Sequence, residues 1–266
     1  MGIDEYRVRK NQKIRLRDYD PDDVHLAPDK KKANEQNAAM QEQLAALQEL
    51  IYAGNQHKLL VLLQGMDASG KDGAIRHVMG GFNPQGVRVV SFGKPNEAEL
   101  DHDYLWRIHP HMPGKGEVTV FNRSHYEDVL VVRVHDLVPK SAWKKRYAQI
   151  NDFERMLSEN GTIILKFFLH ISKSEQRKRL QERVEDPTKR WKFQHGDLAV
   201  RKLWSSYQRA YEDALTQCST PWAPWHIVPA NQKWYRNYVI GSIVIDALKR
   251  LKMKFPQPDL SGVVVE

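Results

Sequence analysis

The chain has 266 residues, of which 41% are hydrophobic, a single cysteine and a net charge of +8 at pH 7. This apolar content excludes global disorder, and the lone Cys218 excludes both an intrachain disulfide and a cysteine-based metal site. The excess of basic residues predicts a polyanionic partner: nucleic acid, an anionic membrane or a phosphate-rich substrate. No apolar run approaches the roughly 18 residues of a membrane-spanning helix, and residues 1–23 are too charged for a secretory signal. We therefore expect a cytoplasmic protein without a membrane partner.

The hydrophobic pattern predicts an N-terminal arm, an amphipathic helix and then strands that alternate with helices. Residues 1–30 are charged and read as an irregular arm, and Met40, Leu44, Leu47 and Ile51 recur at helical spacing within 31–53. The predicted strands are 58–64, 87–92, 118–121, 162–169 and 226–228, and the later predicted helices are 71–79, 101–111, 141–160, 173–184, 198–215 and 235–251. This alternation predicts an α/β fold with a parallel sheet covered by helices on both faces, and ligands at the carboxyl ends of its strands.

A glycine-containing loop joins the first predicted strand to the next helix. Residues 65–71, GMDASGK, match the pattern G-x-x-x-x-G-K in the strand–loop–helix context that this phosphate-binding motif requires. Glycines let several backbone N–H groups point at one anion, the helix N-terminus adds partial positive charge, and Lys71 adds a full charge. The predicted phosphate-binding residues of the loop are Gly65, Ala68, Ser69, Gly70, Lys71, Asp72 and Gly73. The alternative is an ordinary glycine-rich turn.

Carboxylates beside a phosphate loop indicate a metal ion. Asp67 and Asp72 would repel phosphate on their own, and Asp72 stands where Ser or Thr is usual. We expect Mg²⁺ to link Asp67 to the substrate, with Asn122, at the end of the third predicted strand, as a neutral ligand. For Asp72 the alternative is stabilisation of the helix dipole. Arg123 follows at the strand end, where it would neutralise charge on a transferring phosphoryl group.

Five motifs resemble the family-2 polyphosphate kinases, over roughly residues 50–250. They are GMDASGKDGAIRHV at 65–78, FGKPNEAELDHDYLWRIH at 92–109, FNRSHYEDVLVVRVH at 121–135, FFLHIS at 167–172 and RWKF at 190–193. The resemblance implies a P-loop kinase-like three-layer α/β/α sandwich with a central parallel sheet and a helical lid. The expected divisions are an arm and amphipathic helix at 1–54, a phosphotransferase core at 55–254 with a basic lid at about 173–202, and a C-terminal tail at 255–266.

The same resemblance implies an activity. It is the reversible, in-line transfer of the terminal phosphoryl group of inorganic polyphosphate to ADP, AMP or both. Asn122 and the residues SHYED at 124–128 are similar to the subgroup that uses both nucleotides. The resemblance further implies Mg²⁺ as cofactor with Mn²⁺ as an alternative ion, guanine as well as adenine nucleotides, and a homo-oligomer, either a dimer or a tetramer.

Site residues also follow from the resemblance. It places Asp67, Lys71, Arg123 and the lid residue Arg183 around the transferring phosphate. The implied nucleotide-binding residues are Asn122, Arg123, Glu127, Asp128 and Arg133. Among the basic residues outside the loop, we expect Arg76 and Lys192 to contact the polyphosphate chain, and the alternative for Arg76 is an ordinary surface position. The alternative for Glu127 and Asp128 is the first turn of a solvated helix, where acids are favoured. For the basic lid it is a solvated helical face.

Two other functions compete with this one. An ATP-dependent nucleotide or small-molecule kinase would use the same loop, and the preferred phosphoryl donor separates it from a polyphosphate kinase. A nucleic-acid-binding protein is suggested only by the positive charge. The sequence contains no motif that resembles a helix-turn-helix, a zinc finger or an RNA-binding sheet, so we expect no nucleic-acid partner.

Overall fold

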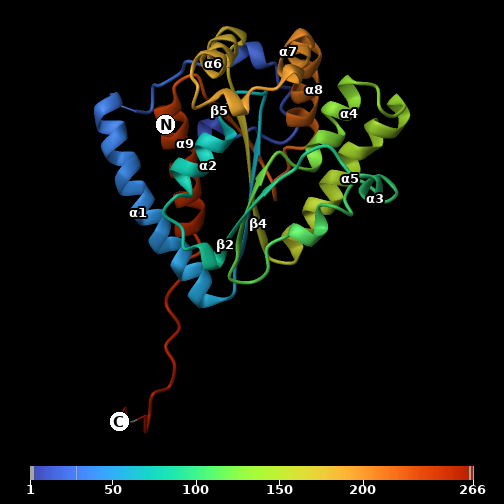
Figure 1. Ribbon diagram of the computed structural model, residues 1–266. Coiled ribbons are helices and arrows are strands. Elements are labelled where there is room, and N and C mark those ends of the chain that lie inside the picture. Colours follow the sequence, from blue (N-terminus) through green and yellow to red (C-terminus); the bar gives the residue numbers. More distant parts are fainter. Residues whose placement is uncertain (1–2, 28, 264, 266) are drawn as a thin grey trace.

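Five parallel strands form the centre of the protein (Figure 1). The computed structural model describes residues 3–27, 29–263 and 265. The strands are β1 (Lys58–Gln64), β2 (Val87–Ser91), β3 (Val118–Asn122), β4 (Thr162–His170) and β5 (Trp225–Pro229), in the spatial order β2-β3-β1-β4-β5. All four neighbouring pairs are parallel, which confirms the predicted sheet. β1 and β4 are buried almost throughout, as the continuous apolar runs of central parallel strands require.

Helices cover both faces of the sheet, so the three-layer α/β/α prediction is also confirmed (Figure 1). The helices of one face are α1 (Lys30–Gly54), α2 (Lys71–Val78) and α9 (Lys233–Lys249), and those of the other are α4 (Val131–Val134), α5 (Lys140–Glu159) and α8 (Trp204–Gln217). Each face encloses its own apolar cluster. Two further helices, α6 (Lys173–Glu185) and α7 (His195–Lys202), lie over one end of the sheet.

Two predicted helices were wrong in their extent. The helix expected at 101–111 is replaced by the short helix α3 (Glu97–Leu100), turns and a 3-10 turn at His109–His111. A reciprocal cap between Asn96 and Glu99 starts the helix earlier, and Pro110 has no N–H to continue one later. The helix expected at 198–215 is divided into α7 and α8 at Leu203, whose N–H donates to the Val200 carbonyl instead of continuing the α-helical pattern.

The N-terminal arm is more ordered than its charge suggested. It contains 3-10 turns at Ile3–Tyr6 and Leu16–Asp18, and Arg7 forms an antiparallel bridge to His226 beside β5. Val8 and Leu16 are buried in the core, so the arm covers the sheet edge. At the other terminus, the tail after α9 leaves the body as an extended segment (Figure 1). Within the described residues, no helix combines the length and the apolar character needed to cross a bilayer.

A buried histidine predicts a loss of stability in acid. His226 on β5 places Nδ1 3.2 Å from the carbonyl oxygen of Lys166, and burial lowers the pKa of His226 to about 4. Between about pH 6.5 and pH 4 the unfolded chain binds this proton and the folded protein does not. The free energy of unfolding should therefore fall as the pH is lowered through this window, by up to roughly 3 kcal/mol.

His226→Gln should flatten this acid limb in urea unfolding measured from pH 4 to pH 8. His77→Gln is the matched control, because His77 is an exposed histidine of α2. It should reproduce the wild-type curve. An acid limb of full size in His226→Gln would contradict the assignment.

Candidate active site

The glycine-containing loop lies between β1 and α2, as its motif predicted. Gly70, which caps α2, has φ of +99°, and Ala68 has φ of +64°. A Cβ atom at Gly70 would lie 2.1 Å from Nη1 of Arg236, a buried side chain of α9. Glycine is therefore required at this position both by the left-handed backbone and by the close approach of a side chain.

Three side chains from α6 and α9 hold the loop from behind. The bonds are Gln176 Nε2 to the Asp67 carbonyl at 3.0 Å, Arg179 Nη1 to the Ala68 and Ser69 carbonyls at 3.0 and 2.9 Å, and Arg236 Nη1 to the Gly70 carbonyl at 3.0 Å. In a planar trans peptide the N–H points opposite to the C=O. Because these carbonyls point toward α6 and α9, the N–H groups of the residues that follow them point away from α6 and α9. The N–H of Ser69 already has a partner within the loop, because it donates to the Met66 carbonyl.

These bracing residues were missed in the sequence. Gln176 and Arg179 stand in the basic segment that was assigned to the lid, whereas Arg236 interrupts the apolar surface of the last helix. The one signal in the sequence was a single charged residue, Arg236, among the apolar positions of this helix. That pattern does not predict which group the guanidinium contacts. Burial, with Arg179 nearby, lowers the pKa of Arg236 to about 9. Two guanidinium groups behind the loop add positive potential where an anion would bind.

Lys71 lies within the loop itself. Its Nζ donates to the carbonyls of Gly65 at 2.9 Å and Met66 at 3.4 Å, and the side chain is buried. Burial lowers the pKa of Lys71, and the charge of Asp67 opposes this effect. The ammonium group is thus held at the loop without an ion pair of its own among the described residues.

A cavity of about 270 Å³ opens in front of the loop. It is lined by Asp67, Ala68, Gly70, Lys71, Asp72, Asn122, Arg123, Arg183, Trp191, Lys192, Gln194 and Asp197. The loop, the end of β3 and the segment between α6 and α7 all contribute to its walls. The structure therefore brings together most of the residues that were predicted to bind phosphate or to act in its transfer.

The end of β3 faces the loop through two short contacts. Arg123 Nη2 lies 2.8 Å from Asp67 Oδ1, and Asn122 Nδ2 donates to Asp72 Oδ1 at 2.6 Å. Burial disfavours the charged form of Arg123 and by itself would lower its pKa. The nearby charges of Glu127 and Asp67 together have the larger effect, so the pKa of Arg123 is raised. Arg123 also has φ of +63°, a conformation that is uncommon for residues other than glycine and is often found at functional sites.

The oxygen-bearing side chains of this cavity fit Mg²⁺. Among the described residues there is no group of three or more His, Cys, Asp or Glu side chains that would form a complete metal cage. Mg²⁺ does not need one, because it is usually held by one or two carboxylates together with substrate phosphates and water. Asp67, Asp72 and Asn122 line the same cavity as the loop and provide such a partial set.

Glu127 lines a second cavity of about 170 Å³, on the other side of Asp67 and Arg123. Its remaining walls include Val131, His135, Val200, Tyr207 and Tyr211. Burial raises the pKa of Glu127, while Arg123 and Lys71 oppose this shift. The two cavities share Asp67 and Arg123, so a ligand in one would lie directly beside a ligand in the other.

Three predicted site residues lie elsewhere. Asp128 accepts a hydrogen bond from Arg146 at 2.7 Å in a separate hollow, where burial raises the pKa of Asp128 to about 6. Arg133 donates to Asp213 at 2.6 Å and its guanidinium lies 4.6 Å from the Trp143 ring centroid. Arg76 is exposed on α2 and lines neither cavity. The predicted contacts of these three residues with substrate are not supported by their positions.

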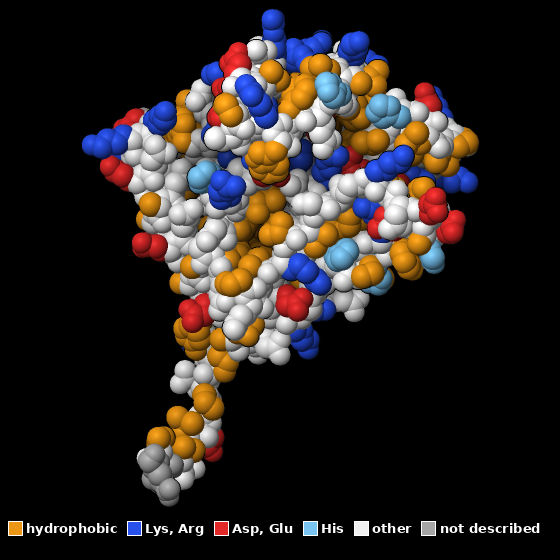
Figure 2. Space-filling view, in the orientation of Figure 1, with side chains coloured by type: hydrophobic (Ala, Val, Ile, Leu, Met, Phe, Trp, Pro, Cys, Tyr) orange, Lys and Arg blue, Asp and Glu red, His pale blue; other side chains and the backbone are white. Residues whose placement is uncertain are grey.

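Residues of the segment that was predicted to form a lid line the same cavity. Arg183 Nη1 lies 3.3 Å from Asp197 Oδ2 and donates to the Lys192 carbonyl at 3.2 Å, and both Arg183 and Lys192 line the cavity. Trp191 is 77% exposed, with Nζ of Lys192 5.0 Å from its ring centroid. Figure 2 shows Lys and Arg side chains gathered over the end of the molecule where α6 and α7 lie.

Comparisons with known proteins agree with this arrangement. Residues 27–256 match the model of a family described as polyphosphate kinase 2. An AMP/ADP-polyphosphate phosphotransferase of Meiothermus ruber is 55% identical over 264 residues, which cover 98% of this chain and 99% of that protein. An ADP-polyphosphate phosphotransferase of Rhodopseudomonas palustris is 42% identical, with 95% and 92% covered.

A solved structure extends the agreement to three dimensions. The crystal structure of polyphosphate kinase 2 from Arthrobacter aurescens superposes with a TM-score of 0.90 at 42% identity, and the match covers 95% of this chain and 94% of that one. The family predicted from the five sequence motifs is thereby confirmed. The chain belongs to the polyphosphate kinase 2 family.

Proposed function

We propose that the protein transfers the terminal phosphoryl group of inorganic polyphosphate to ADP and to AMP, and that the reaction is reversible. The observation that carries the proposal is the convergence of Lys71, Arg123 and Arg183 on one cavity in front of a braced phosphate loop. The relative from Meiothermus ruber is an AMP/ADP-polyphosphate phosphotransferase, and that from Rhodopseudomonas palustris is an ADP-polyphosphate phosphotransferase. None of them supports the alternative of an ATP-dependent kinase for another acceptor.

In this reaction a terminal phosphate oxygen of the nucleotide attacks the last phosphorus of the chain, and the bond to the bridging oxygen breaks. The shortened polyphosphate leaves as an anion. The acceptor oxygen is already deprotonated near neutral pH, so no strong general base is needed. Lys71 and the loop hold the donor, and Arg123 and Arg183 offset charge in the transition state. The lid at 173–202 keeps water away from the phosphoryl group.

Mg²⁺ is the proposed metal, held by Asp67 and Asn122 with Asp72 beside them, and Mn²⁺ would use the same ligands. When bound, the ion would neutralise phosphate charge and align the donor and acceptor. The nucleotide would occupy the second cavity beside Glu127. Guanine nucleotides as further acceptors and a dimeric or tetrameric assembly are included in the proposal because family resemblance implies them.

The first test is direct. Purified protein with long-chain polyphosphate, Mg²⁺ and ADP should form ATP, and with AMP in place of ADP it should form ADP first. EDTA should abolish both reactions, and excess Mg²⁺ should restore them. Robust transfer from ATP to another acceptor, with no transfer from polyphosphate, would refute the proposal in favour of the ATP-dependent alternative.

Salt should weaken the use of polyphosphate steeply. If Lys71, Arg123, Arg183 and Lys192 together neutralise about four phosphates, raising NaCl from 50 to 200 mM should raise the KM for polyphosphate roughly fifty- to a hundred-and-fifty-fold. Arg183→Ala should reduce the slope of log KM against log salt by the contribution of about one phosphate contact. Arg155→Ala, an exposed arginine of α5 paired with Asp152, is the matched control and should leave the slope unchanged. Equal slopes in all three proteins would argue against Arg183 as a phosphate contact.

A further inference from the structure

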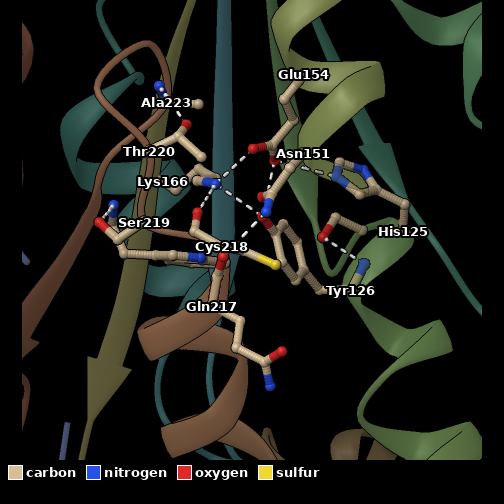
Figure 3. Close-up of polar contacts among 12 residues, drawn as sticks. His125, Tyr126, Asn151, Glu154, Lys166, Gln217, Cys218, Ser219, Thr220 and Ala223 are labelled. Atoms are coloured by element: carbon tan, nitrogen blue, oxygen red, sulfur yellow. Dashed lines mark hydrogen bonds and ion pairs between the residues drawn. The ribbon is translucent and has the colours of Figure 1, made fainter. Parts of the chain in front are cut away.

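A cluster of buried charges joins β4, α5 and the turn that follows β3 (Figure 3). Lys166 of β4 places Nζ 2.5 Å from Oε2 of Glu154 on α5, and both side chains are completely buried. Tyr126 and His125 join them from the 3-10 turn η5 (His125–Asp128), which follows β3. Tyr126 donates to Glu154 at 2.9 Å, and Nε2 of His125 lies 3.3 Å from the same carboxylate. We call these four residues the buried ion cluster.

Its hydrogen bonds allow one arrangement. Lys166 has three donors, which go to Glu154, to the hydroxyl of Tyr126 at 2.7 Å and to the carbonyl of Cys218 at 2.7 Å (Figure 3). The Tyr126 hydroxyl accepts from Lys166 and donates to Glu154, so its one hydrogen has a fixed direction. Within the described residues Nδ1 of His125 has no partner, whereas the hydrogen-bonding groups of Lys166, Glu154 and Tyr126 are all satisfied by one another or by Cys218. A satisfied network of this kind holds its parts rigidly.

Stability does not explain such a cluster. Removing two charges from water has a desolvation penalty that their attraction often fails to exceed, and apolar residues of similar size are frequently neutral or stabilising replacements. The other central positions of β1 and β4 are occupied by such residues, for example Leu62 and Phe168. We therefore expect Lys166 to have a role other than stabilising the fold. The residues that it contacts indicate what that role is.

Tyr126 connects the cluster to the two residues that face the proposed substrates. It lies between Arg123 and Glu127 in the sequence, and both of these line the cavities beside the loop. At the start of η5, Ser124 Oγ accepts from Gln64 Nε2 of β1 at 3.1 Å. The turn is therefore anchored by β1 as well as by the buried ion cluster. Arg123 needs such anchoring, because its left-handed backbone is unfavourable for a non-glycine residue unless the surroundings hold it.

We propose that the buried ion cluster is a positioning device for phosphoryl transfer: Lys166 and Glu154 fix Tyr126, and Tyr126 fixes η5 so that Arg123 and Glu127 face the phosphate loop. This inference rests on the proposed function. Lys166, Glu154 and Tyr126 touch no substrate and act through the residues that do. Since Lys71 and the loop still bind the donor when η5 moves, a loosened turn lowers kcat more than it raises KM.

Two tyrosines provide a matched test. Tyr126→Phe removes a buried hydroxyl with two partners beside the active site. Tyr6→Phe removes a buried hydroxyl that also has two partners, Asp23 at 2.9 Å and Tyr235 at 2.6 Å, in the packing of the N-terminal arm against α9. We expect similar losses of thermal stability in both variants, but a fall in kcat of roughly ten- to a hundred-fold in Tyr126→Phe only, with KM within about three-fold of wild type.

The double variant Lys166→Met/Glu154→Leu separates positioning from stability, because it also removes both partners of the Tyr126 hydroxyl. It removes both charges together, so we expect it to fold with a Tm near that of wild type. Its kcat should nevertheless fall as in Tyr126→Phe. Without any substrate, hydrogen exchange at residues 123–128 should be faster than in wild type in both variants, while exchange in α1 and α9 stays the same.

Wild-type kcat in the double variant would overturn the inference, and so would unchanged hydrogen exchange at 123–128. Equal losses of kcat in Tyr126→Phe and Tyr6→Phe would also overturn it, because they would track stability alone. Transfer by the wild-type enzyme is measured in the same series, and the exchange experiment needs no turnover. A failure of this inference is therefore distinguishable from a failure of the proposed function.

Discussion

Lys71→Met is expected to lower kcat/KM for transfer from polyphosphate by about 10³-fold or more. The ammonium group is the one full positive charge supplied by the loop, and it is held against the Gly65 carbonyl at 2.9 Å in a buried position where electrostatic interactions are strong. Loss of a single preorganised donor in a comparable site lowers kcat by about 10²–10³-fold, and here a charge is lost as well. Methionine keeps the length and the apolar stem of lysine, so the fold should persist.

The control for this variant is Lys189→Met. Lys189 belongs to the segment predicted to form the lid, and its Nζ lies 2.7 Å from Asp186, outside both cavities. Its replacement removes the same charge from the same general region, and kcat/KM should stay within about three-fold of wild type, as is usual for exposed ion pairs. If Lys71→Met raised KM with kcat intact, Lys71 would contribute to binding alone and not to the transition state.

The phosphate loop was predictable because its chemistry is local. Gly65, Gly70 and Lys71 are close in sequence, and the apolar strand before them and the helix after them fix their relative positions. The sheet was predictable for a similar reason, since short segments of five to nine mainly apolar residues leave few alternatives to buried strands. What the sequence could not show was the support behind the loop. Arg179 and Arg236 reach it from positions more than 100 residues further along the chain.

Residues adjacent in sequence were also separated by the fold. Glu127 and Asp128 were predicted together as nucleotide-binding residues, but they line different cavities. They belong to a 3-10 turn, in which successive side chains point about 120° apart, so two neighbours cannot share one ligand pocket easily. Arg133 follows in α4 and points toward α8, where it meets Asp213. A motif specifies which residues occur together in a family, whereas the backbone path decides which of them face the substrate.

Gly70→Ala should be the most damaging single-methyl change in the loop. The new Cβ would lie 2.1 Å from Arg236 Nη1, and the backbone φ of +99° is already unfavourable for alanine. Strain and displacement of a buried guanidinium should together lower the free energy of unfolding by roughly 2–5 kcal/mol. Because Arg236 holds the Gly70 carbonyl, the loop should also lose its anion-binding shape, and kcat should fall about a hundred-fold or more.

Gly54→Ala is the matched control, because Gly54 ends α1 and an added Cβ there meets no atom within 4 Å. It should be neutral or slightly stabilising in urea unfolding and neutral in the transfer assay. A double variant, Gly70→Ala/Arg236→Met, then divides the effect. Removing the guanidinium relieves the contact but leaves the backbone strain and the unsupported carbonyl, so stability should be partly recovered while kcat stays low. Recovery of kcat along with stability would mean that Arg236 supports the fold of the loop without shaping its phosphate-binding face.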